Sequence, residues 1–92
     1  MYLIRTRQGH LYTGITTDVE RRFEEHQRGS GAKYLRSKGP LQLVYDVEIG
    51  GRSLASKAEY AIKGLPKAKK EAIVAQQLNR KQMLRALNLG DD

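Results

Sequence analysis

The sequence predicts an α+β fold in which a small three-stranded antiparallel sheet is flanked by helices. Three short runs of residues typical of strands fall in the first half of the chain, and the first two are joined by a short turn. Segments with apolar residues at helical spacing follow, each beginning near a capping residue. With 92 residues the chain is long enough for one domain with a thin core.

The strands are predicted from residues 2–5, 11–16 and 41–49. Gly9 supplies the positive φ that joins the first two as a hairpin. Alternation places Tyr12, Gly14 and Thr16 on one face of the second strand, where a tyrosine beside a bare glycine leaves room for a ligand to approach. The third strand alternates apolar and polar residues except at Val44, which predicts one buried face.

Two helices are predicted to frame the third strand. Thr17 and Glu20 have the spacing of a capping box, which starts a helix that runs to about Gln27. Glycines at 29 and 31 end it. Ser53 is the predicted cap of the second helix, whose apolar positions are Leu54, Ala58, Ile62 and Leu65.

The last part of the chain predicts two more helices. Pro66 suits the first turn of a helix over residues 67–78, and Asn79 with Gln82 forms a second capping box. A short helix then carries Met83, Leu84 and Leu87. We therefore expect a main domain over residues 1–78 and a C-terminal helical extension, residues 79–92, packed on the same domain.

Composition limits the chemistry available to this protein. The chain has no cysteine and two distant histidines, which excludes thiol catalysis and a Cys- or His-rich metal site, so any metal is expected to be hard and bound by oxygen. No apolar run is long enough for a membrane span, and no signal pattern opens the chain, so we expect a cytoplasmic protein with no membrane contact.

The net charge of +7 lies entirely before residue 71. Residues 1–40 carry eight basic and four acidic side chains, residues 41–70 carry six and three, and residues 71–92 carry three of each. A basic first three-quarters favours a polyanion such as a phosphate backbone as partner, although a basic surface that serves solubility explains the same numbers.

Several side chains stand at spacings that favour shared chemistry, each with a simpler interpretation beside it. Arg22 and His26 are four residues apart on one helix and can point at one ligand or form a solvated edge. From spacing alone, Glu59 and Lys63 form a surface ion pair, and Tyr2 and Tyr12 are ordinary strand aromatics.

Taken together and in order, these residues resemble the GIY-YIG nuclease family, over about residues 2–75. The residues that carry the resemblance are Tyr2-Leu3-Ile4, Tyr12-Thr13-Gly14, Thr16, Asp18, Arg22, His26 and Glu59. The strings over residues 29–34 and 52–60 look like the small stand-alone bacterial branch of that family, often called YhbQ-like.

The resemblance implies hydrolysis of DNA phosphodiesters with one divalent cation, Mg²⁺ or Mn²⁺, and no small-molecule cofactor. Glu59 is then the metal ligand, and a single carboxylate with several waters is an ordinary magnesium shell. Arg22 clamps the phosphate with its planar fork of donors. One tyrosine takes the proton from water, and His26 relays that proton or holds a tyrosine hydroxyl; whether Tyr2 or Tyr12 is the base stays open.

Outside these five residues, the expected DNA contacts are Gly14, Lys33, Arg36 and Lys38, the last three in a flexible basic loop. The chain also departs from the family pattern. Only Met1 stands before Tyr2, which predicts a frayed first strand, and Thr13 replaces the usual isoleucine. A supporting asparagine that several members place after the glutamate has only Val74 or the later Asn79 as counterparts.

Three functions therefore remain as hypotheses. The first is a metal-dependent endonuclease or exonuclease, with DNA repair as a possible setting. The alternative is a catalytically weak or inactive nucleic-acid-binding module, which predicts salt-sensitive binding without turnover. The third is a helper protein that docks another chain through Met83, Leu84 and Leu87. The oligomeric state and the preferred DNA structure stay open.

Overall fold

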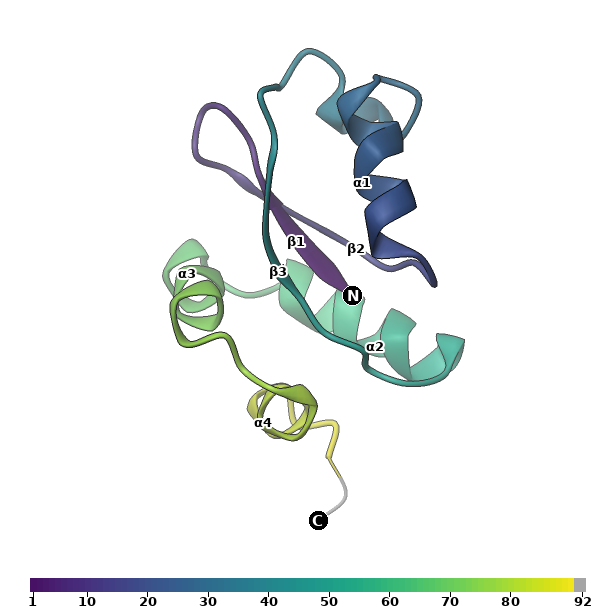
Figure 1. The fold of residues 1–92 in the computed structure, drawn as a ribbon. Helices are drawn as coiled ribbons and strands as arrows, with labels where there is room; N and C mark the ends of the chain where they lie inside the picture. Colours follow the sequence, from purple (N-terminus) through teal and green to yellow (C-terminus); the bar gives the residue numbers. More distant parts are fainter. Residues whose placement is uncertain (91–92) are drawn as a thin grey trace.

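A computed structural model describes residues 1–90 of the chain and confirms the predicted α+β fold (Figure 1). In chain order, the elements are β1 (Tyr2–Arg5), β2 (Leu11–Gly14), α1 (Val19–Gln27), the 3-10 turn η1 (Lys33–Leu35), β3 (Gln42–Asp46), α2 (Arg52–Lys63), α3 (Lys67–Gln76) and α4 (Arg80–Ala86). The longest of these helices, α2, has 12 residues, so no helix within residues 1–90 can cross a membrane.

The sheet is antiparallel with strand order β2-β1-β3, which puts the first strand in the centre. Tyr2, Leu3 and Ile4 are all buried there. The ammonium group of Met1 donates to the carbonyl of Val47 at 3.0 Å, and the Val47 amide donates back to the Met1 carbonyl at 2.9 Å. The predicted fraying of this strand is therefore wrong, because pairing on both sides holds it.

Strand β3 changes its inward face partway along. Its register against β1 pairs Leu3 with Tyr45 but Ile4 with Leu43, so Val44 is the extra residue of a β-bulge. A bulge shifts the alternation by one, so Leu43 packs on the α1 side of the sheet while Tyr45 packs on the other side. The prediction of a single buried face fails at Val44, where the alternation in the sequence lapses.

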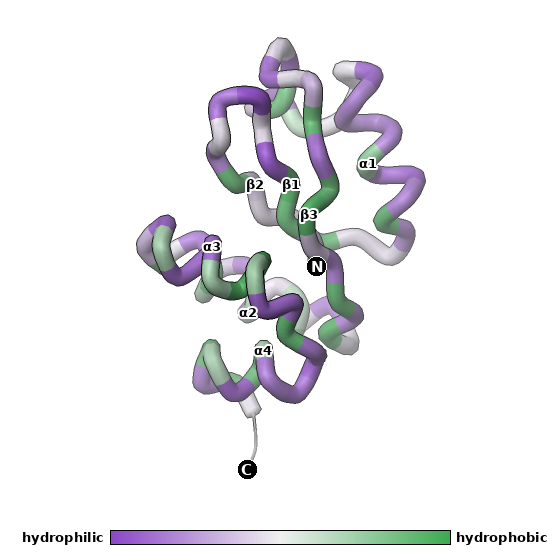
Figure 2. Tube along the Cα trace, turned by 60° about the vertical axis from the view of Figure 1, so that its left-hand side comes forward, coloured by the Kyte–Doolittle hydropathy of each residue, from purple (hydrophilic) through white to green (hydrophobic). Residues whose placement is uncertain are grey.

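Each face of the sheet has its own core. The face covered by α2, α3 and α4 holds the larger one, called here the helical core, and Figure 2 shows hydrophobic residues gathered along the strands between the helices. Its buried residues are Met1, Leu3, Tyr45, Ile49, Ala58, Ile62, Ile73, Met83 and Leu84. The face covered by α1 holds the smaller α1-side core, formed by Tyr2, Ile4, Leu35 and Leu41 with Tyr12, Val19 and Phe23 against them.

Two predicted helix caps are displaced. Helix α1 is capped by Asp18, whose side chain accepts from the Arg21 amide at 3.1 Å, rather than by Thr17. Asp18 is in turn fixed by Thr16, whose hydroxyl oxygen accepts from the Asp18 amide at 3.1 Å. Helix α2 is capped by Gly51 rather than Ser53, without a side-chain bond. These shifts leave the expected apolar positions inward, with Ala58 and Ile62 fully buried.

The C-terminal helices join the helical core. The predicted capping box of Asn79 and Gln82 is present, with bonds of 2.9 Å in both directions. Met83 and Leu84 are buried against the protein's own core. Two of the three side chains expected to dock another chain are therefore covered by the protein's own core, while Leu87 is half-buried, and the helper-protein hypothesis stays a prediction. Of the predicted extension over residues 79–92, the last two residues lie outside the described part.

Candidate functional site

The centre of the candidate site is a buried hydrogen bond between Tyr2 of β1 and His26 of α1. The Tyr2 hydroxyl lies 2.8 Å from His26 Nε2, and both side chains are only 2% exposed. A Cβ at Gly14 would lie 2.3 Å from the Tyr2 hydroxyl oxygen, so the tyrosine ring crosses the bare backbone of β2. This corrects the role expected for Gly14: its open space admits Tyr2 rather than DNA.

A group of aromatic rings surrounds this bond. The ring of Tyr12 lies 6.5 Å from the ring of Tyr2 and 5.7 Å from that of His26, measured between centroids. On its outer side Tyr12 stacks on Tyr34 at 6.0 Å with an interplanar angle of 13°. Lys38 Nζ lies 5.0 Å from the centre of the Tyr34 ring, within cation–π range. The array therefore runs from the buried hydroxyl to a basic surface.

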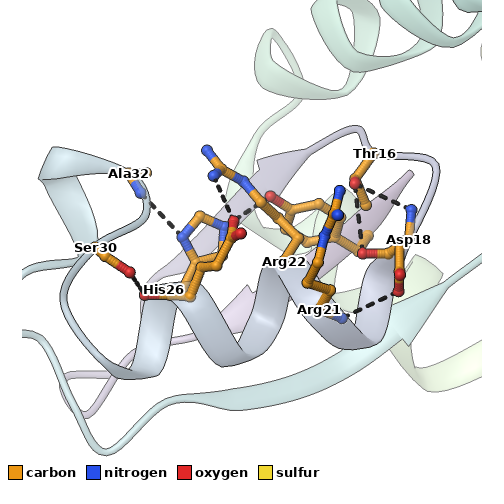
Figure 3. A network of polar contacts seen from close by, with 9 residues as sticks. Thr16, Asp18, Arg21, Arg22, His26, Ser30 and Ala32 are labelled. Carbon is orange, nitrogen blue, oxygen red and sulfur yellow. Dashed lines mark hydrogen bonds and ion pairs between the residues drawn. The ribbon is translucent and has the colours of Figure 1, made fainter.

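Arg22 stands one turn before His26 on the same face of α1, as Figure 3 shows. The Asp18 cap and Thr16 fix the start of this helix and so position both side chains. The Arg22 guanidinium donates to Glu25 at 3.0 Å and remains partly exposed. It also lies close enough to Tyr2 to lower the pKa of that hydroxyl, against the larger effect of burial.

Electrostatics keep the buried pair neutral. Burial raises the pKa of Tyr2, and neighbouring Tyr12 adds to the rise, while Arg22 opposes it. Burial also lowers the pKa of His26 below its usual value, and the charge of Arg22 lowers it further. Near pH 7 the pair therefore consists of a phenol and a neutral imidazole, and phenolate formation needs more positive charge than Arg22 supplies.

Glu59, on α2, acts on the same hydroxyl through its charge. Its carboxylate is among the charges that raise the pKa of Tyr2, after burial and Tyr12. The side chain is 24% exposed, and Oε2 pairs with Lys63 Nζ at 3.3 Å, so the ion pair expected from spacing is present. Among residues 1–90 no three His, Asp or Glu side chains gather, so a cation here would rely on Glu59 and water, which suits Mg²⁺.

The structure thus brings together Tyr2, Tyr12, Arg22, His26 and Glu59, which come from two strands and two helices. The predicted basic DNA contacts lie to one side. Lys33 begins η1 and Lys38 follows it, while Arg36 lines a surface cavity of about 490 Å³ together with Arg7 and His26. Arg7 had no predicted site role, because its position in the hairpin turn gave no signal.

Three further residues of the segment after α1 contact the site. Ala32 donates its amide to His26 Nδ1 at 3.0 Å, Gly31 lies against the same ring, and Tyr34 stacks on Tyr12. Residues 29–31 were expected only to end the helix, and the residues from Lys33 on were expected to form a flexible basic loop. Its repeated glycines, Gly29 and Gly31, were the available signal, because closely spaced glycines often mark a close backbone approach.

Neither counterpart of the family's asparagine supports Glu59. Asn79 uses its side chain to cap α4, where it accepts from the Gln82 amide at 2.9 Å. Val74 packs against the helical core. Within residues 1–90, the ionic contact of Glu59 is therefore with Lys63.

Comparison with known proteins gives consistent results. A family model described as the GIY-YIG catalytic domain matches residues 1–72, a range that includes all five gathered side chains. The chain is 54% identical over 87 residues to the UPF0213 protein YhbQ of Escherichia coli K12, which covers 95% of this chain and 87% of the relative. The YhbQ protein of Shigella boydii serotype 18 is 53% identical with the same coverage.

One solved structure is also similar. The solution NMR structure of the UPF0213 protein BH0048 from Bacillus halodurans aligns with a TM-score of 0.54 and 41% sequence identity. The alignment covers 83% of this chain and 81% of that chain. The likeness therefore extends over most of the fold as well as the sequence.

Proposed function

The chain belongs to the GIY-YIG family, in its small UPF0213 branch, and from this membership we propose that it is a nuclease that hydrolyses DNA phosphodiesters with one divalent cation. The observation that carries the proposal is the Tyr2 hydroxyl. It lies 2.8 Å from His26 Nε2 and is acted on by the charges of both Arg22 and Glu59. The proposed general base therefore lies beside a cation that can bind the phosphate, and the charge of the proposed metal ligand acts on the same oxygen.

Glu59 is the proposed metal ligand. Its carboxylate is partly exposed, and a hard oxygen donor of this kind fits Mg²⁺ or Mn²⁺ with water completing the shell. The bound cation supplies Lewis-acid stabilisation of the phosphate oxygens and acidifies water. Lys63, which forms an ion pair with Glu59, would compete with the cation for the same carboxylate oxygen.

Arg22 is the proposed phosphate clamp. Its guanidinium is exposed enough to meet a substrate and is already oriented by Glu25. A planar guanidinium binds two phosphate oxygens at once, and that contact strengthens as charge develops on the phosphoryl group. The Lys33, Arg36 and Lys38 side chains extend the positive surface along which the DNA backbone is proposed to lie.

Tyr2 is the better supported general base of the two tyrosines. Its hydroxyl is hydrogen-bonded to His26, and the nearby Arg22 cation favours the phenolate. Burial alone disfavours that phenolate, so a divalent cation held by Glu59 would have to supply the further positive charge that lets Tyr2 act as a base. Tyr12 packs beside Tyr2 and orients it.

The test is a cleavage assay over single-stranded, duplex, flap and branched DNA, with and without Mg²⁺ or Mn²⁺. We expect metal-dependent cleavage that is lost in Glu59→Ala and Arg22→Ala. Matched controls are Glu24→Ala and Arg28→Ala, which remove an exposed ion pair of α1 held at 3.4 Å. Both controls should cut as the wild type does. Unchanged cleavage by folded Glu59→Ala protein contradicts the mechanism.

The binding module is the second candidate, and the Glu59–Lys63 ion pair is the observation that favours it. If that ion pair persists in the presence of Mg²⁺, Glu59 does not bind the cation. The basic surface then binds DNA without cleaving it. This function predicts DNA binding that weakens steeply with salt, because backbone contacts release counterions, and no cleavage with either metal. Restored cleavage in Lys63→Ala would reject it in favour of the nuclease.

A further inference from the structure

The turn after α1 folds back onto His26, as Figure 3 shows for Ser30 and Ala32. Gly29 adopts a φ of 82°, and both the amide and the hydroxyl of Ser30 donate to the Glu25 carbonyl, at 3.0 and 3.3 Å. The amide bond holds the turn at the end of the helix, and the longer hydroxyl bond lies beside it. The next amide that is free to point inward, that of Ala32, donates to His26 Nδ1 at 3.0 Å.

Gly31 allows the contact between the Ala32 amide and His26 because it has no side chain. A Cβ at position 31 would lie 2.2 Å from His26 Nδ1 and 3.0 Å from His26 Cα. Carbon atoms do not approach that closely, so any other residue would push the turn away from the imidazole. The φ of Gly31 is outside the left-handed region. The glycine is therefore required for close approach and not for an unusual backbone angle.

The proton of the imidazole follows from these contacts. An amide N–H can only donate, so Nδ1 must accept with its lone pair and carries no proton. A neutral imidazole has one N–H, which then sits on Nε2, the atom 2.8 Å from the Tyr2 hydroxyl oxygen. His26 is therefore the donor in that bond, and the Tyr2 hydroxyl does not donate its proton to His26.

We propose that Gly31 and the Ala32 amide are positioning residues that lock His26 as the Nε2–H tautomer, so that His26 donates to Tyr2 and does not relay its proton. The structural part stands on the contacts alone, and its catalytic meaning rests on the proposed nuclease function. Of the two roles that the sequence left open for His26, relay and support, this tautomer allows support. A donor at that oxygen favours the phenolate that a basic Tyr2 requires.

The tautomer is measured directly by long-range ¹H–¹⁵N NMR of the imidazole rings. The chain has two histidines, and His10 lies exposed in the hairpin turn, so it serves as an internal reference. We expect wild-type His26 near pH 7 to show a protonated Nε2 and an unprotonated Nδ1, while His10 shows averaged tautomers. A protonated Nδ1 in His26 overturns the proposal.

Gly31→Ala tests the positioning role, and Ser30→Ala is the matched control because it removes one hydroxyl bond from the same turn and leaves the amides. We expect Gly31→Ala to lose the single-tautomer pattern of His26 and to lower kcat about 10- to 100-fold with little change in KM. Ser30→Ala should keep both. An unchanged kcat alongside an altered tautomer overturns the catalytic role of the lock.

The NMR result on wild-type protein also separates the two proposals. A locked Nε2–H tautomer in a protein that cleaves no DNA supports the lock and counts against the nuclease function. Metal-dependent cleavage together with averaged tautomers at His26 supports the nuclease function and overturns the lock. If Gly31→Ala does not fold, the wild-type spectrum still decides whether the lock exists.

Discussion

The two faces of the sheet each bury a tyrosine, and the two hydroxyls have opposite surroundings. On the helical-core face, Tyr45 is 3% exposed and donates to the Leu78 carbonyl at 2.5 Å. On the α1 face, Tyr2 is 2% exposed and meets the His26 imidazole, with the Arg22 cation nearby. Burial raises the pKa of both, but only at Tyr2 does a neighbouring cation oppose the rise.

The difference separates a structural tyrosine from a chemical one. A carbonyl acceptor needs the Tyr45 proton, so this hydroxyl is held neutral and links β3 to the chain between α3 and α4. Near Tyr2, the Arg22 cation stabilises a negative oxygen, but this arrangement buries the polar His26 ring in the core. The α1 face is thus packed like a core but carries polar groups that meet at one oxygen.

The largest expected effect concerns Tyr45 at high pH. Burial, followed by the charge of Asp46, raises its pKa to about 12 from an ordinary value of 10.0. Between those pH values the unfolded chain loses the proton while the folded protein keeps it, so stability falls as pH rises. A shift of this size corresponds to about 2–3 kcal/mol in the free energy of unfolding by pH 12.

Urea denaturation at several pH values from 8 to 12 measures this loss. Tyr45→Phe should be less stable than wild type at pH 8, because it lacks the bond to Leu78, but its stability should fall less steeply above pH 10. Tyr60→Phe is the control, since that side chain is 83% exposed. If the free energy of unfolding fell equally steeply with pH in wild type and Tyr45→Phe, the pKa of Tyr45 would be the same in the folded and unfolded states, which contradicts the prediction.

The next effect tests how rigidly the α1 face holds Tyr2. In Gly14→Ala the new methyl group would lie 2.3 Å from the Tyr2 hydroxyl oxygen and 2.5 Å from Cζ. The buried ring has nowhere to move, so we expect a loss of about 1–3 kcal/mol and loss of cleavage. Stability is measured by urea denaturation and activity by the gel assay.

Gly64→Ala is the matched control for that variant. Its Cβ would lie 3.6 Å from the Ala61 carbonyl, an ordinary contact, and its φ of −84° suits any residue. We expect a change within about 0.5 kcal/mol. A Gly14→Ala protein as stable and active as this control would show that Tyr2 is free to shift, which removes the contrast with Tyr45.

Local rules predicted much of the fold. Alternation and capping found all three strands and all four helices, and β1 and the Asn79 capping box were placed to the residue. The misplaced features depend on contacts that neither alternation nor the capping rules describe. The bulge at Val44 follows from what each half of β3 packs against, and the choice of Asp18 over Thr17 follows from the bond that Thr16 makes.

The site was predictable in its residue types but not in its internal support. The resemblance to the GIY-YIG family pointed to Tyr2, Tyr12, Arg22, His26 and Glu59. The structure packs the first four together, and the charge of Glu59 acts on the Tyr2 hydroxyl. The closely spaced glycines at 29 and 31 indicated a close backbone approach, but its target could not be foreseen. An amide is present at nearly every position, and only the folded turn aims that of Ala32 at the imidazole.

The smallest expected effect is on stability, and it is measured at two buried threonines. The hydroxyl of one has a hydrogen-bond partner and the hydroxyl of the other has none. Thr13 Oγ1 is buried without a hydrogen-bond partner in the described part of the protein, whereas Thr6 Oγ1 accepts from the His10 amide at 3.2 Å. Removing an unsatisfied hydroxyl lifts a desolvation cost, so Thr13→Val should raise stability by about 1 kcal/mol. Thr6→Val should lower stability by a similar amount, because the His10 amide loses its hydrogen-bond acceptor. The two variants have the same change in shape, so opposite signs in urea denaturation isolate the hydrogen bond. A loss in both would mean that Thr13 has a partner, and its polar atom would then be as well supported as those around Tyr2.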